Sequence, residues 1–199
     1  IQTEENRLVI AATNLEVAAV YHIGAKVTAG GSITVPARLV SEFVSNLPKD
    51  TIELKADGAK LNIASGKYTS TINGVVADEF PALPTITPTS TLTLSADTLK
   101  QAINQTVITA SHDDTRPVLT GVLCHTHEEA LYFAATDGYR LSERKLINTK
   151  EEVKALIPAP TLLEVGRDIP EDCEEVTVLV DDMQVRFVMS DVEVTSRLI

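Results

Sequence analysis

The strongest constraint on the fold of this chain is an internal repeat. Six short segments recur in the same order, and the two copies lie 122 to 126 residues apart in a chain of 199 residues. The matched pairs are Leu8–Thr13 with Leu131–Thr136, Val35–Ala37 with Ile157–Ala159, Leu47–Pro48 with Ile169–Pro170, Ile52–Leu54 with Val176–Val178, Leu61–Ile63 with Val185–Phe187, and Tyr68–Ile72 with Val194–Leu198. Two unrelated β-rich stretches would not keep this offset, so the sequence predicts two similar units.

The repeat also predicts where the units lie. We expect a first unit over residues 1–83, a linker over residues 84–90 and a second unit over residues 91–199. Proline and threonine are frequent around the linker, which is typical of a connecting segment. Alignment of the copies predicts that the first unit lacks about thirty residues at its front, a helix and a strand, and that the second unit is cut short at its end.

Within each unit the hydrophobic pattern predicts an α+β fold. Asp57-Gly58 and Ser65-Gly66 have the composition of two-residue hairpin turns between strands. We expect strands over residues 7–12, 16–23, 51–56, 60–64 and 67–72, and helices over residues 36–47, 96–111 and 159–167. Pro36 suits the first position of its helix and Ser95 suits an N-cap, whereas Gly166 weakens the third helix.

Composition narrows the class of protein. Hydrophobic residues make up 44% and charged residues 23% of the chain, a globular balance that excludes a disordered acidic tail. No apolar run approaches the roughly 18–20 residues of a membrane span. Two cysteines, Cys124 and Cys173, form no disulfide framework in a chain of this length, which predicts a reducing, cytoplasmic setting. A net charge of −11 argues against coating of nucleic acid by bulk positive charge.

Motifs of enzymatic chemistry are missing from the sequence. There is no G-x-S-x-G, no phosphate-binding G-x-x-x-x-G-K-[ST] and no C-x-x-C. His125 and His127 are spaced to face one side of a strand, and His112 and Asp113 lie in a polar loop. These four residues leave a metal-dependent hydrolase open as an alternative, although a polar strand end and a solvated loop explain them as well.

Two longer strings carry more information. Residues 135–141 read Ala-Thr-Asp-Gly-Tyr-Arg-Leu, and the first copy lacks the Gly-Tyr-Arg insertion at this place. Glycine permits a sharp turn after the strand, which would present Tyr139 and Arg140 at the surface. Residues 116–122, Arg-Pro-Val-Leu-Thr-Gly-Val, precede the strand that leads to this turn. Read from the residues alone, a plain turn and an interaction surface explain residues 135–141 equally well, and Arg116 is expected to be a salt-bridge or surface residue.

Taken together, these strings resemble the bacterial β sliding clamps, the processivity factors of replicative DNA polymerase III. The resemblance also includes Val35–Arg38, Ile157–Ala159 and Asp78–Pro81, and it extends over nearly the whole chain. It implies repeated clamp domains with antiparallel sheets outside and helices lining a ring channel. It further implies a non-enzymatic protein without cofactor, metal or catalytic residues, which encircles duplex DNA. Family members tether the polymerase and other replication and repair proteins, are loaded by a clamp loader, and close as homodimers of three-domain subunits.

The resemblance assigns two sets of site residues. The family's pocket for partner peptides corresponds here to Leu119, Thr136, Gly138, Tyr139, Arg140 and Leu141. The family's DNA-facing positions correspond to Arg38, Lys100, His112, Arg116 and Arg167, with contacts expected to phosphates rather than bases. In the family a third domain completes the pocket, so two units alone are expected to bind peptide weakly.

One rival from another class remains, a duplicated β-rich protein-binding scaffold that never encircles DNA. The charge distribution bears on this choice, because the three predicted helices with their flanking residues carry a net charge of only −1. The remaining acidity would lie on strands, turns and loops. An acidic exterior with a nearly neutral lining suits a protein that retains DNA by encirclement and still slides.

Overall fold

The computed structural model describes residues 1–199, which divide into two compact units. One unit comprises residues 1–12 and 20–83, and the other comprises residues 13–19 and 84–199. The expected division put residues 13–19 in the first unit, whereas the backbone amide of Arg197 donates to the carbonyl of Glu16 and ties this segment to the second. None of the helices combines the length and hydrophobicity of a membrane-spanning segment.

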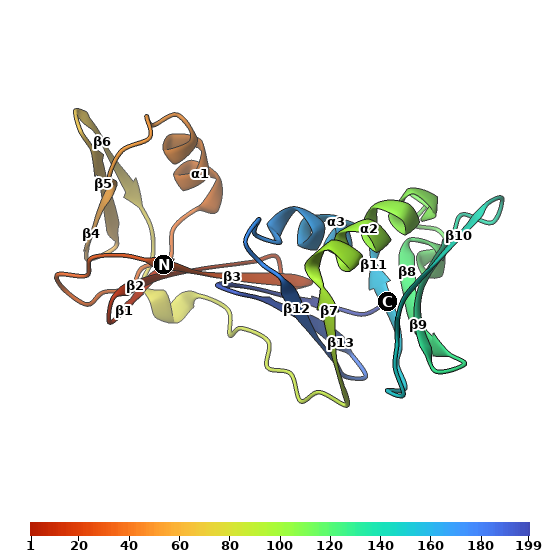
Figure 1. Ribbon diagram of the computed structural model, residues 1–199. Coiled ribbons are helices and arrows are strands. Elements are labelled where there is room, and N and C mark those ends of the chain that lie inside the picture. Colours follow the sequence, from red (N-terminus) through yellow and green to blue (C-terminus); the bar gives the residue numbers. More distant parts are fainter. The chain divides into compact units, whose positions relative to one another are not determined.

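The first unit contains the helix α1 (Ala37–Ser45), a 3₁₀ turn at Ala77–Glu79 and several short strands (Figure 1). Its strands are β1 (Gln2–Glu4), β2 (Arg7–Thr13), the part of β3 (Val17–Gly24) from residue 20 onward, β4 (Glu53–Asp57), β5 (Lys60–Ser65) and β6 (Tyr68–Asn73). Strands β4, β5 and β6 form an antiparallel sheet, and Gly58 and Gly66 take positive φ at its hairpin turns, as the sequence predicts. Val40 and Phe43 of α1 pack against a core of Ile33, Leu61, Ile63 and Ile72.

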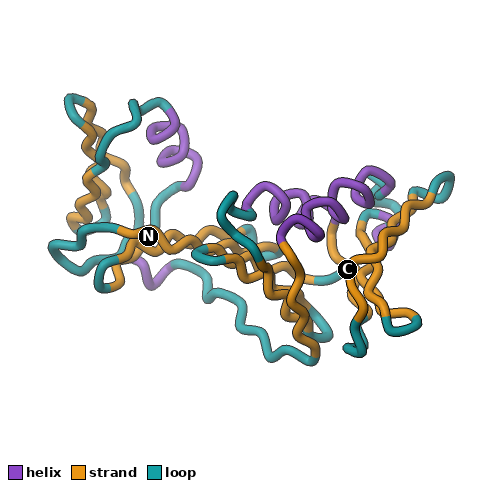
Figure 2. Tube along the Cα trace, viewed as in Figure 1, coloured by secondary structure: helices purple, strands orange, loops and turns teal.

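The second unit contains two antiparallel sheets and two helices. Its elements are β7 (Ser90–Ser95), α2 (Ala96–Thr106), β8 (Gly121–His127), β9 (Ala130–Thr136), β10 (Leu141–Asn148), β11 (Lys154–Pro158), α3 (Ala159–Asp168), β12 (Glu175–Val180), β13 (Gln184–Met189) and β14 (Val192–Arg197). One sheet has the order β10-β9-β8-β11, and β14-β13-β12-β7 follow one another in the second. In Figure 2 both helices lie on the same side of these strands.

The helices of the second unit bury one face of the four-stranded sheet. Helix α2 contacts β9 and β10, and α3 contacts β11. Along β9 the side chains alternate, with Leu131 and Phe133 fully buried and Tyr132 and Ala134 half-buried on the other side. We call this other side the open face. Its residues are Leu123, His125 and His127 of β8, Tyr132, Ala134 and Thr136 of β9, Leu141, Glu143 and Lys145 of β10, and Lys154 and Leu156 of β11.

The predicted repeat is present in the structure. Strands β2, β4, β5 and β6 and helix α1 of the first copy correspond in order to β9, β12, β13, β14 and α3 of the second. Ser95 caps α2 by accepting a hydrogen bond from the amide of Thr98 at 3.2 Å. The prediction that this helix runs to residue 111 is wrong, because it ends at Thr106. The hydroxyl of Thr109 donates to the carbonyls of Thr106 and Ala135, which fixes a 3₁₀ turn in place of another α-helical turn.

Glycine 166 provides a stability prediction for α3. A methyl group built at this position would lie 3.5 Å from Cγ2 of Ile103, an ordinary van der Waals contact, and the φ angle is not positive. We therefore expect Gly166→Ala to raise the free energy of unfolding by about 0.5–1 kcal/mol, because alanine restricts the unfolded chain and favours the helix. Urea denaturation followed by circular dichroism measures the change, and an equal or lower stability would show that α2 and α3 are packed more tightly here.

Candidate peptide-binding pocket and nucleic-acid interface

An apolar pocket lies at one end of the open face. It has a volume of about 310 Å³. The residues that line it are Val118, Gly121, Leu123, Ala134, Ala135, Thr136, Leu141 and Leu156. Apart from Thr136 none of these side chains has a polar atom, so the pocket favours an apolar ligand group over a charged one.

Strand pairing explains why these residues meet. Leu123 of β8 pairs with Ala134 of β9 on one side and with Leu156 of β11 on the other. Directly paired residues of antiparallel strands point to the same face, so three apolar side chains from three strands form a continuous floor. Gly121 allows the strands to approach, since a Cβ there would lie 3.0 Å from the carbonyl oxygen of Ile157.

A tightly bonded turn forms one rim of the pocket region. One carboxylate oxygen of Asp137 accepts hydrogen bonds from the backbone amides of Tyr139 and Arg140, both at 3.0 Å. The other accepts from Nε of Arg140 at 2.9 Å, and Nη2 of Arg140 donates to the carbonyl of Ile108. Gly138 takes a φ of +93° in this turn. The turn is therefore fixed by bonds within the residues 136–140 and anchored to the chain after α2.

These hydrogen bonds hold the pKa of Asp137 at about 2, chiefly through the Arg140 and Tyr139 amides and then the Arg140 side chain. Because the pKa in the fold is below the ordinary value of 3.8, Asp137 stabilises the turn above about pH 4 and this contribution is lost as pH falls toward 2. We expect an NMR titration of its carboxyl carbon to give a midpoint near 2. The protection of the Arg140 amide, measured as its exchange rate relative to an unstructured peptide at the same pH, should fall over the same range, and this fall should be absent in Asp137→Asn. A midpoint near the ordinary value would contradict the bonded turn.

The structure brings two of the six expected pocket residues into the lining, Thr136 and Leu141. Leu119 is half-buried and lies next to the lining residue Val118. Tyr139 is 96% exposed, and Gly138 and Arg140 are exposed beside it. The guanidinium of Arg140 donates to Asp137 and to the carbonyl of Ile108 and does not line the pocket. These residues form the rim turn, whereas β8, β9 and β11 supply the floor.

The floor residues Leu123, Ala134 and Leu156 are missing from the set derived from sequence. One sequence signal could have revealed them. Side chains along their strands point alternately to the buried face and to the open face. A face exposed to solvent would carry polar residues, whereas Leu123, Ala134 and Leu156 on the open face are apolar. The register that unites them across three strands requires the structure.

The expected DNA-facing residues lie on helices and in one loop. Arg38 is exposed on α1 of the first unit, while Lys100 on α2 is half-buried and Arg167 on α3 is exposed. Arg167 forms an ion pair with Glu164 at 2.9 Å, which reduces its attraction for a phosphate. His112 and Arg116 are exposed in the loop after α2, and Nη1 of Arg116 lies beside Gly138 of the rim turn.

The residues of the hydrolase alternative do not form a site. The ring of His125 stacks on that of Tyr132 at 5.7 Å, and His127 pairs with Glu128. The carboxylate of Asp113 accepts two hydrogen bonds from Thr115, which lower its pKa and make it a weaker base. No group of three or more His, Cys, Asp or Glu residues in the chain could hold a metal ion. Burial raises the pKa of the Cys124 thiol to about 12, so it stays protonated at neutral pH.

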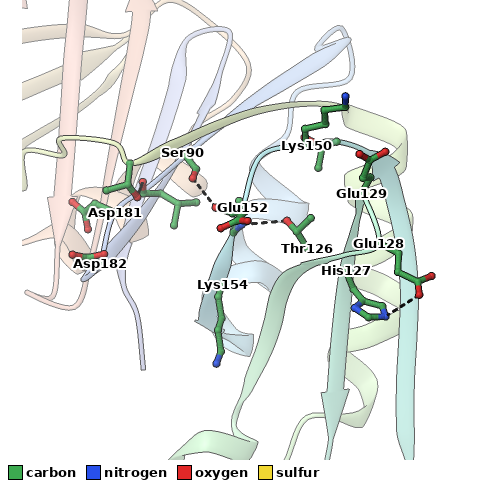
Figure 3. Close-up of a pocket in the computed structure, with 14 residues that line it drawn as sticks. Ser90, Thr126, His127, Glu128, Glu129, Lys150, Glu152, Lys154, Asp181 and Asp182 are labelled. Atoms are coloured by element: carbon green, nitrogen blue, oxygen red, sulfur yellow. Dashed lines mark hydrogen bonds and ion pairs between the residues drawn. The ribbon is translucent and has the colours of Figure 1, made fainter.

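A larger, polar concavity of about 740 Å³ lies at the opposite end of β8 and β9 (Figure 3). It is lined by five carboxylates, Glu128, Glu129, Glu152, Asp181 and Asp182, together with Lys150, Lys154 and several neutral residues. Ser90 donates to the carbonyl of Glu152 and Thr126 to that of Glu151 in this region. Of the candidate residues named from the sequence, only His127 of the hydrolase alternative lines this concavity.

Comparison with known protein families decides between the clamp and the scaffold. Residues 93–199 match the central domain of the DNA polymerase III beta subunit, and residues 1–84 match the N-terminal domain of that subunit. The chain belongs to the DNA polymerase III beta subunit family. This membership places its repeated α+β units among sliding-clamp domains and does not favour the scaffold.

Individual relatives agree with the family match. The beta sliding clamp of Bacillus subtilis is 36% identical over 85% of this chain and 46% of its own length. The beta sliding clamp of Synechococcus elongatus is 34% identical over 96% of this chain and 53% of its own length. The crystal structure of the Bacillus subtilis clamp superposes with a TM-score of 0.89 at 30% identity, covering 100% of this chain and 55% of that one. The griselimycin-bound clamp of Bartonella birtlesii superposes with a TM-score of 0.92 at 26% identity, covering 100% of this chain and 55% of that one. The chain spans about half the length of the curated relatives that it matches.

Proposed function

We propose that this chain is part of a sliding clamp that tethers the replicative DNA polymerase to duplex DNA. The observation that carries the proposal is the apolar pocket on the second unit, which lies beside the two strings shared with the clamp family. A pocket with an apolar floor and a rigid rim suits a short peptide segment with bulky apolar side chains. Thr136 and Leu141 contact such a segment directly, together with Leu123, Ala134 and Leu156.

The rim turn has a separate role in the proposal. The edge of the pocket is held or extended by Leu119, Gly138, Tyr139 and Arg140. The exposed ring of Tyr139 offers further contact area to a bound peptide. The partners are the catalytic subunit of DNA polymerase III, the clamp loader and other replication and repair proteins that carry the same type of segment. The chain performs no chemistry of its own in this role.

Retention of DNA is by encirclement in this proposal. Arg38, Lys100, His112, Arg116 and Arg167 contact phosphates without reading sequence. The chain has a net charge of −11 and few cations at the DNA-facing positions, so its direct affinity for DNA is weak. Weak direct affinity permits sliding along the duplex. Along the sequence, the proposed clamp domains are residues 1–83 and 91–199, joined by residues 84–90, with residues 13–19 grouped with the second unit.

The association state of the whole natural protein tests encirclement. A ring requires two subunits, so size-exclusion chromatography with light scattering should give a homodimer. A strict monomer at high protein concentration would contradict the ring. Peptide binding would remain open to its own test in that case, because it does not require a closed ring.

A further inference from the structure

A second row of side chains crosses the open face next to the pocket. Lys154 of β11 pairs with His125 of β8, His125 pairs with Tyr132 of β9, and Tyr132 pairs with Lys145 of β10. Since paired residues point to the same face, the four side chains form one continuous line across four strands. We call these four residues the cationic row.

Both lysines of the row are free to bind a partner. On β10 the neighbouring residues Ser142 and Arg144 turn toward α2, where they bond Thr106 and Gln101, so Lys145 lies on the open side. Lys145 and Lys154 are exposed and neither forms an ion pair. Figure 3 shows Lys154 extending away from the carboxylates of Glu152 and Asp182.

The aromatic pair between the lysines favours a carboxylate over a nucleobase. The rings of His125 and Tyr132 stack with an interplanar angle of 23°, so each ring covers a face of the other. The stack leaves each ring only one face for a nucleobase, whereas the ring edges and the two flanking ammonium groups remain available to a carboxylate. Two lysines flanking such a pair therefore match an acidic peptide better than a single-stranded nucleic acid.

The row lies within reach of a peptide held in the pocket. Along each strand the row is two residues from the floor residues Leu156, Leu123 and Ala134, which is about 7 Å. An extended peptide advances by about 3.3 Å per residue, so residues two to four positions from an apolar anchor lie over the row. Glu143 pairs with Ala134 beside the floor, so a peptide carboxylate is repelled near the pocket and attracted over the row.

We propose that the cationic row selects partner peptides that carry Asp or Glu two to four residues from the apolar anchor. The inference rests on the proposed peptide binding and adds a specificity element to it. The row supplies local positive charge on a chain whose net charge of −11 would otherwise repel acidic partners. Apolar contacts in the pocket provide the anchor, and the row distinguishes among anchored peptides by their flanking charge.

Fluorescence anisotropy with a set of labelled peptides tests the proposal on the full chain. All peptides carry the same apolar clamp-binding motif, flanked either by serines or by two aspartates placed before or after it. At low salt, one of the two acidic peptides should bind about three- to tenfold more tightly than the serine peptide. This gain should disappear at high salt and in the double variant Lys145→Gln/Lys154→Gln, while Lys150→Gln retains it.

The outcomes separate this inference from the proposed function. If the serine peptide binds but neither acidic peptide gains affinity, or if the gain persists in the double variant, the selection by charge is refuted and the pocket stands. If the serine peptide does not bind, the proposed function fails and the selection falls with it. An oligothymidylate whose binding depends on both lysines, without any preference among the peptides, would assign the row to nucleic acid and overturn the inference.

Discussion

Replacing Leu162 by alanine is expected to lower the free energy of unfolding by about 2–5 kcal/mol. Leu162 lies on α3 and is fully buried, in the helical layer that covers the sheets of the second unit. Removing its isobutyl group deletes apolar contacts and leaves a cavity, because helices held by the surrounding sheets relax only in part. Urea denaturation monitored by circular dichroism measures this loss.

The adjacent residue provides a matched control. Leu163 has the same side chain on the same helix but is 39% exposed. Leu163→Ala should therefore lower stability by less than about 1 kcal/mol. Equal losses in the two variants would mean that the buried face of α3 is assigned to the wrong side.

Introducing a charge into the pocket should have the largest effect on binding. We expect Leu123→Asp to weaken the binding of an apolar clamp-binding peptide by about thirtyfold or more, as at the central residue of an interface. Leu123 is half-buried at the centre of the floor, between Ala134 and Leu156, so a carboxylate there loses apolar contact and faces an apolar ligand. Fluorescence anisotropy with a labelled peptide measures the change in Kd.

Asn148→Asp is the control for this prediction. It adds the same carboxylate to the exposed far end of β10, away from the residues of the pocket. Circular dichroism should show that both variants fold, and the control should bind peptide as the parent chain does. If Leu123→Asp also binds normally, or if both variants lose the same affinity, the floor is not the binding surface.

Much of the fold could be predicted from the sequence because local signals agree with the tertiary structure. Gly58 and Gly66 mark the hairpin turns. Buried and exposed side chains alternate with a period of two residues along the strands, and this pattern is visible in the sequence. The end of α2 depends instead on the Thr109 hydroxyl, which bonds Ala135 of a distant strand. Such a contact has no local sequence signal, and the same holds for the bond between Arg197 and Glu16 that ties residues 13–19 to the second unit.

The site divides in the same way. The family strings contain Thr136 and Leu141, which the structure places in the pocket, but they also contain Arg140, whose guanidinium bonds within the rim turn. Leu123 and Leu156 lie 33 residues apart in the chain and meet only through the register of β8 and β11. Sequence strings therefore identify the rim, and the strand pairing identifies the floor.

In the proposed function, the open face of the second unit receives a partner peptide at its apolar floor. Methyl-detected NMR of the chain, titrated with a peptide that carries the clamp-binding motif of the replicative polymerase, tests it most directly. We expect shifts confined to the methyl groups of Val118, Leu123, Ala134, Leu141 and Leu156. Shifts at Val153 and Val180 of the polar concavity instead, or none on the open face, would contradict it.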